Sequence, residues 1–203
     1  SDGAGTNGTV NAAVLRGALF DDSAIGIGKG FATYGTNGIR LLDPNTEQTN
    51  AYVSGTANIR LDLVEDVGIA GEASNTLQLD NTSGSAKTVT NSGITLIPQN
   101  GLLFSGSSPI TLTGGTLNAN LDASNLEAII LSCNSAEVTL GTAITGDNIT
   151  IGGSGDMTLA ATLTAKTYAS GYIRINKTGT TTLAATTTGA LIINAGTLKL
   201  ASG

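Results

Sequence analysis

The stretch that decides the fold is residues 172–203, YIRINKTGTTTLAATTTGALIINAGTLKLASG. Short apolar groups recur in it at Ile173–Ile175, Leu183, Leu191–Ile193 and Leu198–Leu200, and Gly, Thr and Asn occupy the positions between them. The spacing does not match one face of an amphipathic helix, whereas each group suits a short strand that is followed by a turn. The stretch therefore predicts about two coils of a β-solenoid.

The same pattern of apolar triplets can be followed back through most of the chain. The triplets begin at Ile39, Ile59, Leu77, Ile94, Ile110, Ile129, Ile149, Ile173 and Leu191. Their spacing is a loose period of about 20 residues, and a coil of that length must stack on its neighbours to bury its apolar face. We therefore predict an all-β fold, a right-handed parallel β-helix (β-solenoid) of about 8 to 9 coils over residues 39–203, with its hand taken from the general chirality of parallel crossovers.

Alternation within the strands predicts which side chains face the interior. Near the C-terminus Leu198 and Leu200 share one face, and Lys199 lies on the other. Ile149 and Ile151 are related in the same way, because successive side chains of a strand point to opposite faces. We expect the inward aliphatic side chains to form ladders along the solenoid axis, and the outward positions to carry mainly Thr, Asn and Ser.

Residues 1–38 are predicted to form an N-terminal extension that caps the first coil. An uncovered solenoid end would expose unpaired strand edges, so a cap is expected there. Within this region Phe31–Tyr34 alternates, and Asn37-Gly38 is a strong hairpin signal before the strand Ile39–Leu42. Two stretches break the repeat, residues 120–128 and 160–171, and we interpret them as corner loops that are available for contact with a partner.

The composition excludes several classes of function. The net charge is -6, and the nine Lys and Arg are scattered singly, so the sequence has no basic stripe for nucleic acid. No run approaches the roughly 20 apolar residues of a membrane helix, so we expect no membrane insertion by this segment. The chain has no His, which rules out His-dependent triads and His-based zinc sites. We therefore expect no catalytic residue and no enzymatic activity.

The single cysteine, Cys133, cannot form an internal disulfide. A lone cysteine in a β-rich sequence is most often a small buried residue on a strand, and the alternative is a reactive thiol. We expect the buried position.

The densest group of carboxylates is Asp62, Glu65 and Asp66. The main interpretation is a solvated acidic corner, and the alternatives are a Ca²⁺ site or, less favoured, a catalytic pair. Calcium takes six or more oxygen ligands, of which three carboxylates on one turn supply only part. Ca²⁺ is accordingly the only cofactor for which the sequence offers candidate ligands.

Residues 175–203 resemble the autotransporter-associated β-strand repeat. Lys177–Gly179 and Thr181–Leu183 match the first part of that repeat, and Ile193–Leu200 matches its closing strand pair. The loop between the two parts, Ala184–Gly189, is shorter than in the family. Two further segments, residues 30–43 and 125–146, are similar to parts of the bacterial passenger proteins that carry such repeats.

This resemblance implies a secreted, bacterial cell-surface passenger segment, exported through an outer-membrane barrel. The expected role is a stiff, non-enzymatic stalk or an adhesive fibre, and the expected partners are the rest of its own longer chain and a host or environmental glycan or matrix. One alternative is a self-assembling filament or surface-layer subunit, which would show concentration-dependent sedimentation. The other is a polysaccharide-processing β-helix enzyme, which would cleave glycans and would need a groove of carboxylates with basic and aromatic partners.

Overall fold

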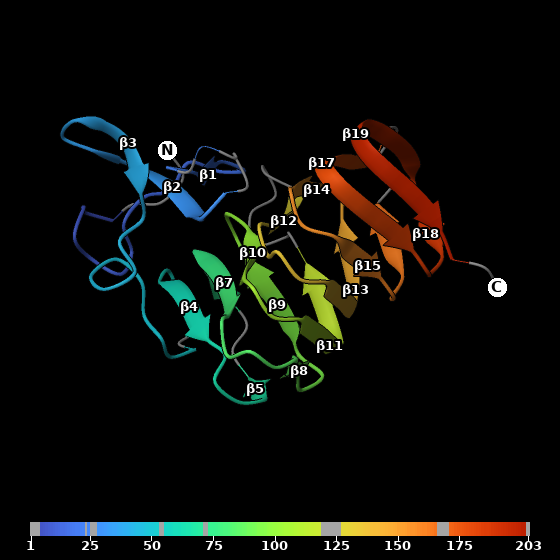
Figure 1. Cartoon of the computed structure of the whole chain (residues 1–203), viewed down its shortest axis with the longest axis horizontal. Coiled ribbons are helices and arrows are strands. Elements are labelled where there is room, and N and C mark those ends of the chain that lie inside the picture. The colour runs from blue at the N-terminus through green and yellow to red at the C-terminus, as the bar shows by residue number, and fades with distance from the viewer. Residues whose placement is uncertain are drawn as a thin grey trace.

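The structure is a computed structural model, and it describes residues 5–22, 24, 28–52, 55–70, 73–118, 127–165 and 171–201. Within these ranges all regular structure is β, in strands β1 to β19. An antiparallel sheet has the order β1-β2-β3, and all remaining strands belong to a second, parallel arrangement. Figure 1 shows the two parts, with the antiparallel sheet near the N-terminus and the parallel coils leading to the C-terminus.

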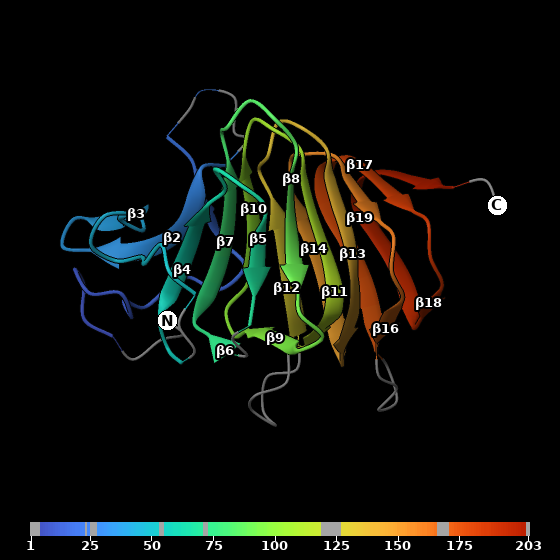
Figure 2. The ribbon, with the colours of Figure 1, turned by 90° about the horizontal axis from the view of Figure 1, so that it is seen from below.

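Each coil of the parallel part contributes a strand to wall 1, the first of three walls. Wall 1 consists of β4 (Asn58–Asp62), β7 (Thr76–Asn81), β10 (Leu102–Gly106), β12 (Glu127–Ser132), β14 (Asn148–Gly153) and the first halves of β17 (Tyr172–Leu183) and β19 (Ala190–Leu200). These strands pair in parallel, each with the strand of the next coil. Figure 2 shows them side by side across the long axis of the molecule.

Two further walls complete each coil. Wall 2 consists of β5 (Val67–Ile69), β8 (Lys87–Asn91), the first halves of β11 (Ile110–Asn118) and β13 (Val138–Gly146), β15 (Met157–Leu159) and the second halves of β17 and β19. Wall 3 consists of β6 (Ala73–Ser74), β9 (Thr95–Pro98), the second halves of β11 and β13, β16 (Leu163–Ala165) and β18 (Thr187–Thr188). The predicted all-β parallel solenoid is therefore confirmed.

The interior is a continuous ladder of aliphatic side chains. Partner positions along wall 1 run through Ile59, Leu77, Leu102, Ile130, Ile151, Ile175 and Ile193. All except the last are fully buried, and they belong to one apolar core that extends through the stack. Burying such a side chain contributes about 1.5–3 kcal/mol, so each coil is stabilised mainly by the coils on either side of it.

The coil boundaries differ from the predicted ones in the middle of the chain. Ile94 precedes β9 of wall 3, and Ile110 begins β11 on wall 2, so neither residue starts a coil. The coil start lies between these two residues. It is on wall 1, in β10, whose Leu102 pairs with Leu77. All three walls carry the same alternating apolar signal, and for that reason the sequence pattern alone does not show which wall a strand belongs to.

The N-terminal region forms the antiparallel sheet of β1 (Leu19–Phe20), β2 (Gly30–Gly35) and β3 (Gly38–Leu41). Gly35 pairs with Gly38 across a two-residue turn, which confirms the predicted hairpin. The strand at Ile39 pairs antiparallel with β2, however, so it does not open the solenoid. The first strand of wall 1 is β4.

The N-terminal region, residues 5–47, covers a side of the solenoid, and we call it the cap. Its Ala12, Val14, Phe31 and Leu42 pack against the outward side chains of wall 1, namely Leu103, Ile129, Leu131 and Cys133, in a second apolar core. The end of the first coil is instead closed by residues 48–52. Thr49 forms a parallel bridge with Ile59, and Tyr52 packs against the interior core. The N-terminal region therefore packs on the flank of wall 1, and the segment that follows it lies at the end of the first coil.

Candidate functional site

A cleft of about 330 Å³ lies between the cap and wall 1, and we call it the cap–wall cleft. One side is the outer surface of β4, β7 and β10, and the other is formed by β2, β3 and the loop that follows β3. The lining residues are Gly28, Lys29, Gly30, Leu41, Leu42, Pro44, Gln48, Arg60, Gln78, Asp80, Thr82, Ser105, Gly106 and Cys133. The cleft is therefore part polar and part apolar.

The strand register explains why the floor of the cleft is polar. Arg60 pairs with Gln78, and Asp80 pairs with Ser105, so these outward side chains stand in two adjacent rows on wall 1. In the next coil the first row continues with Leu103, which packs under the cap. The floor thus changes from polar to apolar where the cap begins to cover the sheet.

A chain of hydrogen bonds fixes the polar side chains of the floor. Gln48 Nε2 donates to Gln78 Oε1 at 3.0 Å, and Gln78 Nε2 donates to Ser105 Oγ at 2.9 Å. Ser105 Oγ donates in turn to Asp80 Oδ1. Arg60 Nη2 donates to the other carboxylate oxygen, Asp80 Oδ2, at 3.0 Å. Because every bond in this chain leads to Asp80, the orientation of both amides is determined.

The charges in the cleft are balanced locally. Arg60 Nε lies 3.0 Å from Asp62 Oδ1, an ion-pair distance without hydrogen-bond geometry, while its Nη2 contacts Asp80. The guanidinium therefore lies between two carboxylates. Lys29 pairs with Asp22 at 3.1 Å, and both side chains are more than half exposed. The cleft offers little net positive charge to an anionic ligand.

Cys133 lines the inner end of the cleft, directly after β12. The residue is buried, as predicted, and burial raises the pKa of its thiol to about 12. A thiol with such a pKa stays protonated at neutral pH and is a poor nucleophile. The structure therefore gives no support to the alternative of a reactive cysteine.

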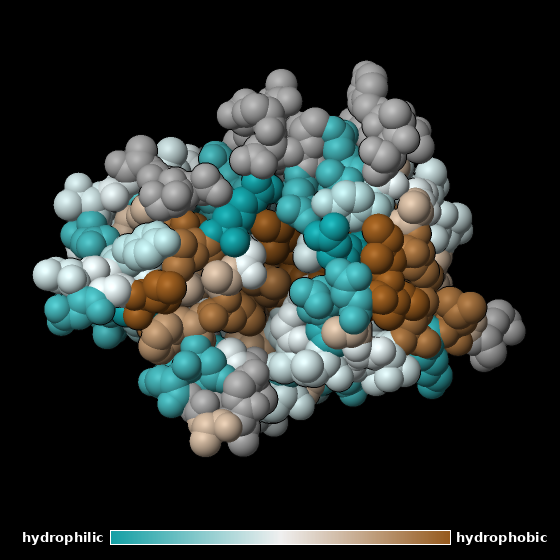
Figure 3. Space-filling view, turned by 90° about the horizontal axis from the view of Figure 1, so that it is seen from above, coloured by the Kyte–Doolittle hydropathy of each residue, from teal (hydrophilic) through white to brown (hydrophobic). Residues whose placement is uncertain are grey.

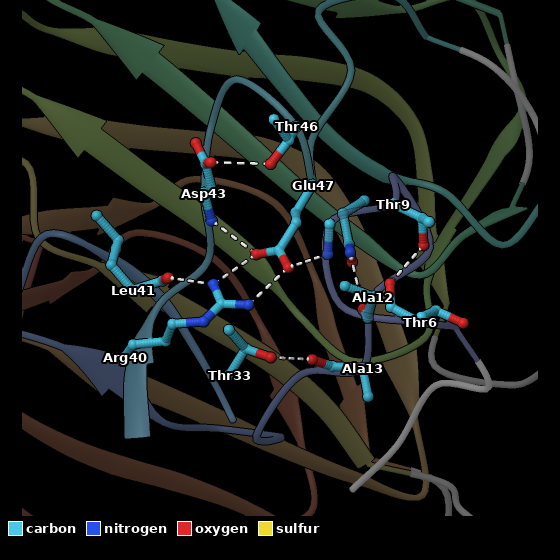
Figure 4. Close-up of polar contacts among 12 residues, drawn as sticks. Thr6, Thr9, Ala12, Ala13, Thr33, Arg40, Leu41, Asp43, Thr46 and Glu47 are labelled. Atoms are coloured by element: carbon cyan, nitrogen blue, oxygen red, sulfur yellow. Dashed lines mark hydrogen bonds and ion pairs between the residues drawn. The ribbon is translucent and has the colours of Figure 1, made fainter. Parts of the chain in front are cut away.

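An ion pair between Arg40 and the buried carboxylate of Glu47 holds the loop that carries Gln48, and Figure 4 shows its contacts. Arg40 on β3 donates from Nη1 and Nη2 to the two carboxylate oxygens of Glu47, each at 2.6 Å. The backbone N–H of Asp43 and that of Gly8 donate to the same carboxylate. These contacts, above all the one with Arg40, lower the pKa of Glu47 to about 2. Sequence reasoning did not find this pair, because no spacing rule relates a strand residue to a loop residue seven positions later.

Two of the three candidate Ca²⁺ ligands already have other partners. Asp62 is paired with Arg60, and Asp66 Oδ1 accepts the backbone N–H of Thr88 at 2.7 Å. Asp62 and Glu65 do line a second cleft, of about 570 Å³, near the closed end of the solenoid. Within the described ranges, however, no three His, Cys, Asp or Glu side chains are grouped in a way that would hold a metal ion.

The two predicted contact loops are only partly described. Residues 119–126 and 166–170 lie outside the described ranges, so the structure does not place most of the first loop, nor residues 166–170 of the second. Within the second stretch, Leu163–Ala165 forms β16 and pairs with β13 on wall 3. That part of the expected loop belongs to the solenoid.

One charged side chain points into the solenoid interior. Lys177 on β17 is 1% exposed, and its Nζ has no hydrogen-bond partner among the described residues. Burial lowers the pKa of this lysine to about 8, and the charge of Asp156 partly opposes the shift. In its interior row the preceding positions are Ser132 and Gly153, which leave room for the long side chain.

No protein-family model, curated protein or solved structure matches this chain. The part of the chain that the structure describes also contains no helix long and apolar enough to cross a membrane.

Proposed function

We propose that this chain is a non-enzymatic structural or adhesive segment of a bacterial cell-surface passenger, a stiff β-solenoid stalk that works outside the cell. The observation that carries the proposal is the unbroken interior ladder that joins every coil to the next. Stacked coils of this kind add about 4.8 Å of length each, so the architecture suits a rod. The resemblance of residues 175–203 to an autotransporter-associated repeat supports the surface location.

The exposed apolar edge of the last coil also supports a stalk. Leu191 and Ile193 on β19 are 40% and 49% exposed, whereas their β17 partners Ile173 and Ile175 are buried. Leu200 is 69% exposed. Figure 3 shows this apolar surface in brown at the C-terminal end. A further coil in the same register would bury these side chains, and the rest of a longer chain is the partner we propose for this edge.

The test is to append a second copy of residues 172–201 after Ala201. We expect the melting temperature to rise and the binding of a hydrophobic dye to fall, because the added coils would cover β19. The control carries the same extension with its inward aliphatic residues replaced by Thr. Equal behaviour of the two extended proteins would contradict the stalk proposal.

A self-assembling filament is the second candidate, and the same exposed edge favours it. A head-to-tail filament needs an open strand edge at both ends of the subunit. At the N-terminal end Thr49 pairs with Ile59, so the edge of β4 is partly occupied. We therefore favour the stalk. Sedimentation over a range of concentrations separates the two, because only the filament predicts growth with concentration.

The third candidate, a polysaccharide-processing enzyme, has less support. The carboxylate of the cap–wall cleft, Asp80, and that of the neighbouring Asp62 are both engaged by Arg60. Glycoside hydrolysis uses two carboxyl groups, one on each side of the scissile bond, and neither Asp80 nor Asp62 is free to act in such a pair. Incubation with neutral and acidic polysaccharides, followed by analysis of chain length, tests this candidate directly.

A further inference from the structure

We propose that the cap–wall cleft binds a neutral saccharide unit. This inference rests on the proposed surface function and gives the adhesive role a location and a ligand class. It places the contact on the flank of wall 1, between the cap and strands β4, β7 and β10.

The size and lining of the cleft suit a small hydroxylated ring. Its volume of about 330 Å³ is at the small end of the range for pockets that hold organic ligands. Leu41, Leu42 and Pro44 line the side that belongs to the cap, and Gln48, Gln78 and Asp80 are among its polar lining residues. A sugar ring has C–H faces and a hydroxyl rim, so it matches a cleft with one apolar and one polar side.

The polar groups of the cleft are held in place before any ligand arrives. Gln48, Gln78, Ser105, Asp80 and Arg60 orient one another through the hydrogen-bond chain, so their rotamers need not be ordered on binding. A glutamine amide has two donor hydrogens and two acceptor lone pairs, and the chain uses only some of them. The remaining donors and acceptors can serve hydroxyl groups, which both donate and accept.

The charge of the cleft favours a neutral ligand over an anionic one. The guanidinium of Arg60 already lies between the carboxylates of Asp62 and Asp80. A sulfated or phosphorylated ligand would have to displace one of these carboxylates or approach both of them. A neutral hydroxyl can add to the existing pairs without separating them. Among the described residues, no aromatic side chain lines the cleft, so we expect a dissociation constant on the order of 1 mM.

The test uses saturation-transfer-difference NMR on the whole chain, with glucose, galactose, N-acetylglucosamine and lactose as probes. We expect saturation transfer to at least one of them, and no stronger binding to the sulfated chain heparin. Arg60→Met and Gln48→Met should each weaken binding by about tenfold or more, since each removes a polar group from the cleft. The matched control is Arg174→Met, because Arg174 is another outward arginine on wall 1, on β17 and outside the cleft.

Three results would overturn the proposal. They are no saturation transfer from any neutral probe, binding that Arg174→Met weakens as much as Arg60→Met, and selective binding of heparin. Gln48→Met retains the Arg60 ion pairs, so it stays informative if Arg60→Met fails to fold. Failure here would leave the coil-extension result unchanged, so the loss of the saccharide site and the loss of the stalk proposal can be distinguished.

Discussion

At the scale of single residues, Lys177 is the side chain whose environment conflicts most with its chemistry. An ammonium group without a hydrogen-bond partner is costly to bury, and the cost is reduced when the group loses its proton. The lowered pKa of about 8 expresses this cost. The aliphatic part of the side chain nevertheless fills an interior row in which Ser132 and Gly153 supply little volume.

We predict that Lys177→Met stabilises the protein at pH 7. Folding lowers the lysine pKa from 10.5 to about 8, so the folded state binds fewer protons than the unfolded state between these values. The penalty is complete below pH 8 and disappears as the pH rises to 10.5. It corresponds to about 3 kcal/mol at most. Urea denaturation should therefore show that the difference in free energy of unfolding between variant and wild type decreases from pH 8 to pH 10.5.

Comparing Lys177→Met with the wild type cancels the contribution of other groups that titrate in this pH range. Burial raises the pKa values of Cys133 and Tyr52 to about 12, and both residues are present in wild type and variant. Each of them loses stabilisation as the pH rises above its unfolded value, which is opposite in sign to the effect of Lys177. A difference in free energy of unfolding that stays constant with pH would show that Lys177 is not buried as an unpaired cation.

Glu47 has the opposite electrostatic role, because its buried charge is fully partnered. We predict that Glu47→Gln costs about 2 kcal/mol of stability at pH 7, through loss of the charge-assisted bonds from Arg40. The folded pKa of about 2 lies below the unfolded value of 4.5, so this stabilisation is present above pH 4.5 and is lost as the pH falls to 2. Urea denaturation of both proteins from pH 7 to pH 2 tests this.

The control for Glu47 is Asp22→Asn, in an ion pair whose side chains are more than half exposed. Such surface pairs contribute little, so this variant should change stability by less than about 0.5 kcal/mol. Equal effects of the two substitutions would refute the role assigned to Glu47.

At the scale of the element, the ends of the wall 1 strands depend on glycine. Gly153 closes β14 with a φ of 101°, and a Cβ there would lie 2.0 Å from the carbonyl oxygen of Ser132 in the preceding coil. The corner thus requires both a positive φ and a close approach of two backbones. Gly106 closes β10 in the same way, with a φ of 106° and a Cβ position 2.2 Å from the carbonyl oxygen of Asn81.

We predict that Gly153→Ala destabilises the protein by more than about 3 kcal/mol, because the two coils would have to separate to accommodate the methyl group. Gly84→Ala is the matched control. Gly84 also has a positive φ, of 80°, but a Cβ there would meet nothing within 4 Å. Gly84→Ala should lower stability by only about 1 kcal/mol, through backbone strain alone. Thermal unfolding of both variants separates strain from steric contact, and equal losses would contradict the argument.

The elements also show how far the sequence can be interpreted. Strict alternation, as in β14, predicted the inward side chains Ile149 and Ile151 correctly. The continuous apolar run in β12, Ala128–Leu131, has a different cause, since this strand is buried on both faces. Such runs could have located the flank under the cap. The wall assignment of Ile94 and Ile110 could not be inferred, because it depends on corner geometry that alternation does not encode.

At the scale of the whole molecule, the cap and the solenoid share a core of their own. Phe31 contributes a large buried side chain to it, and Cys133 lies on the solenoid side. The sequence predicted the cap but not the surface it covers. The contacts between β2 and the solenoid join segments roughly 70 to 100 residues apart, and no local signal specifies such pairing. The cap–wall cleft exists only because of this docking, so it could not be predicted from the sequence either.

We predict that Phe31→Ala loosens the cap and exposes Cys133. Replacing a buried phenylalanine with alanine lowers stability by about 3–5 kcal/mol, and here it mainly weakens the contact between the cap and the solenoid. The reaction of Cys133 with a thiol reagent should therefore accelerate while the far-UV circular dichroism of the solenoid persists. Tyr34→Ala is the control on the same strand, because Tyr34 is half exposed. Unchanged thiol reactivity in Phe31→Ala would show that the cap does not protect the cysteine.

The unequal coils have a consequence for how the length of the molecule can be varied. Partner positions on wall 1 are separated by 18 residues between Ile59 and Leu77, and by 28 residues between Leu102 and Ile130, yet both pairs lie in adjacent strands. Because both pairs of strands stay in register, residues added between the strands of a coil, at a corner, add nothing along the axis. Axial length is therefore counted in coils and not in amino acids. A peptide inserted at such a corner would be displayed at a fixed height, and a molecular ruler could be lengthened by whole coils without changing what each corner presents.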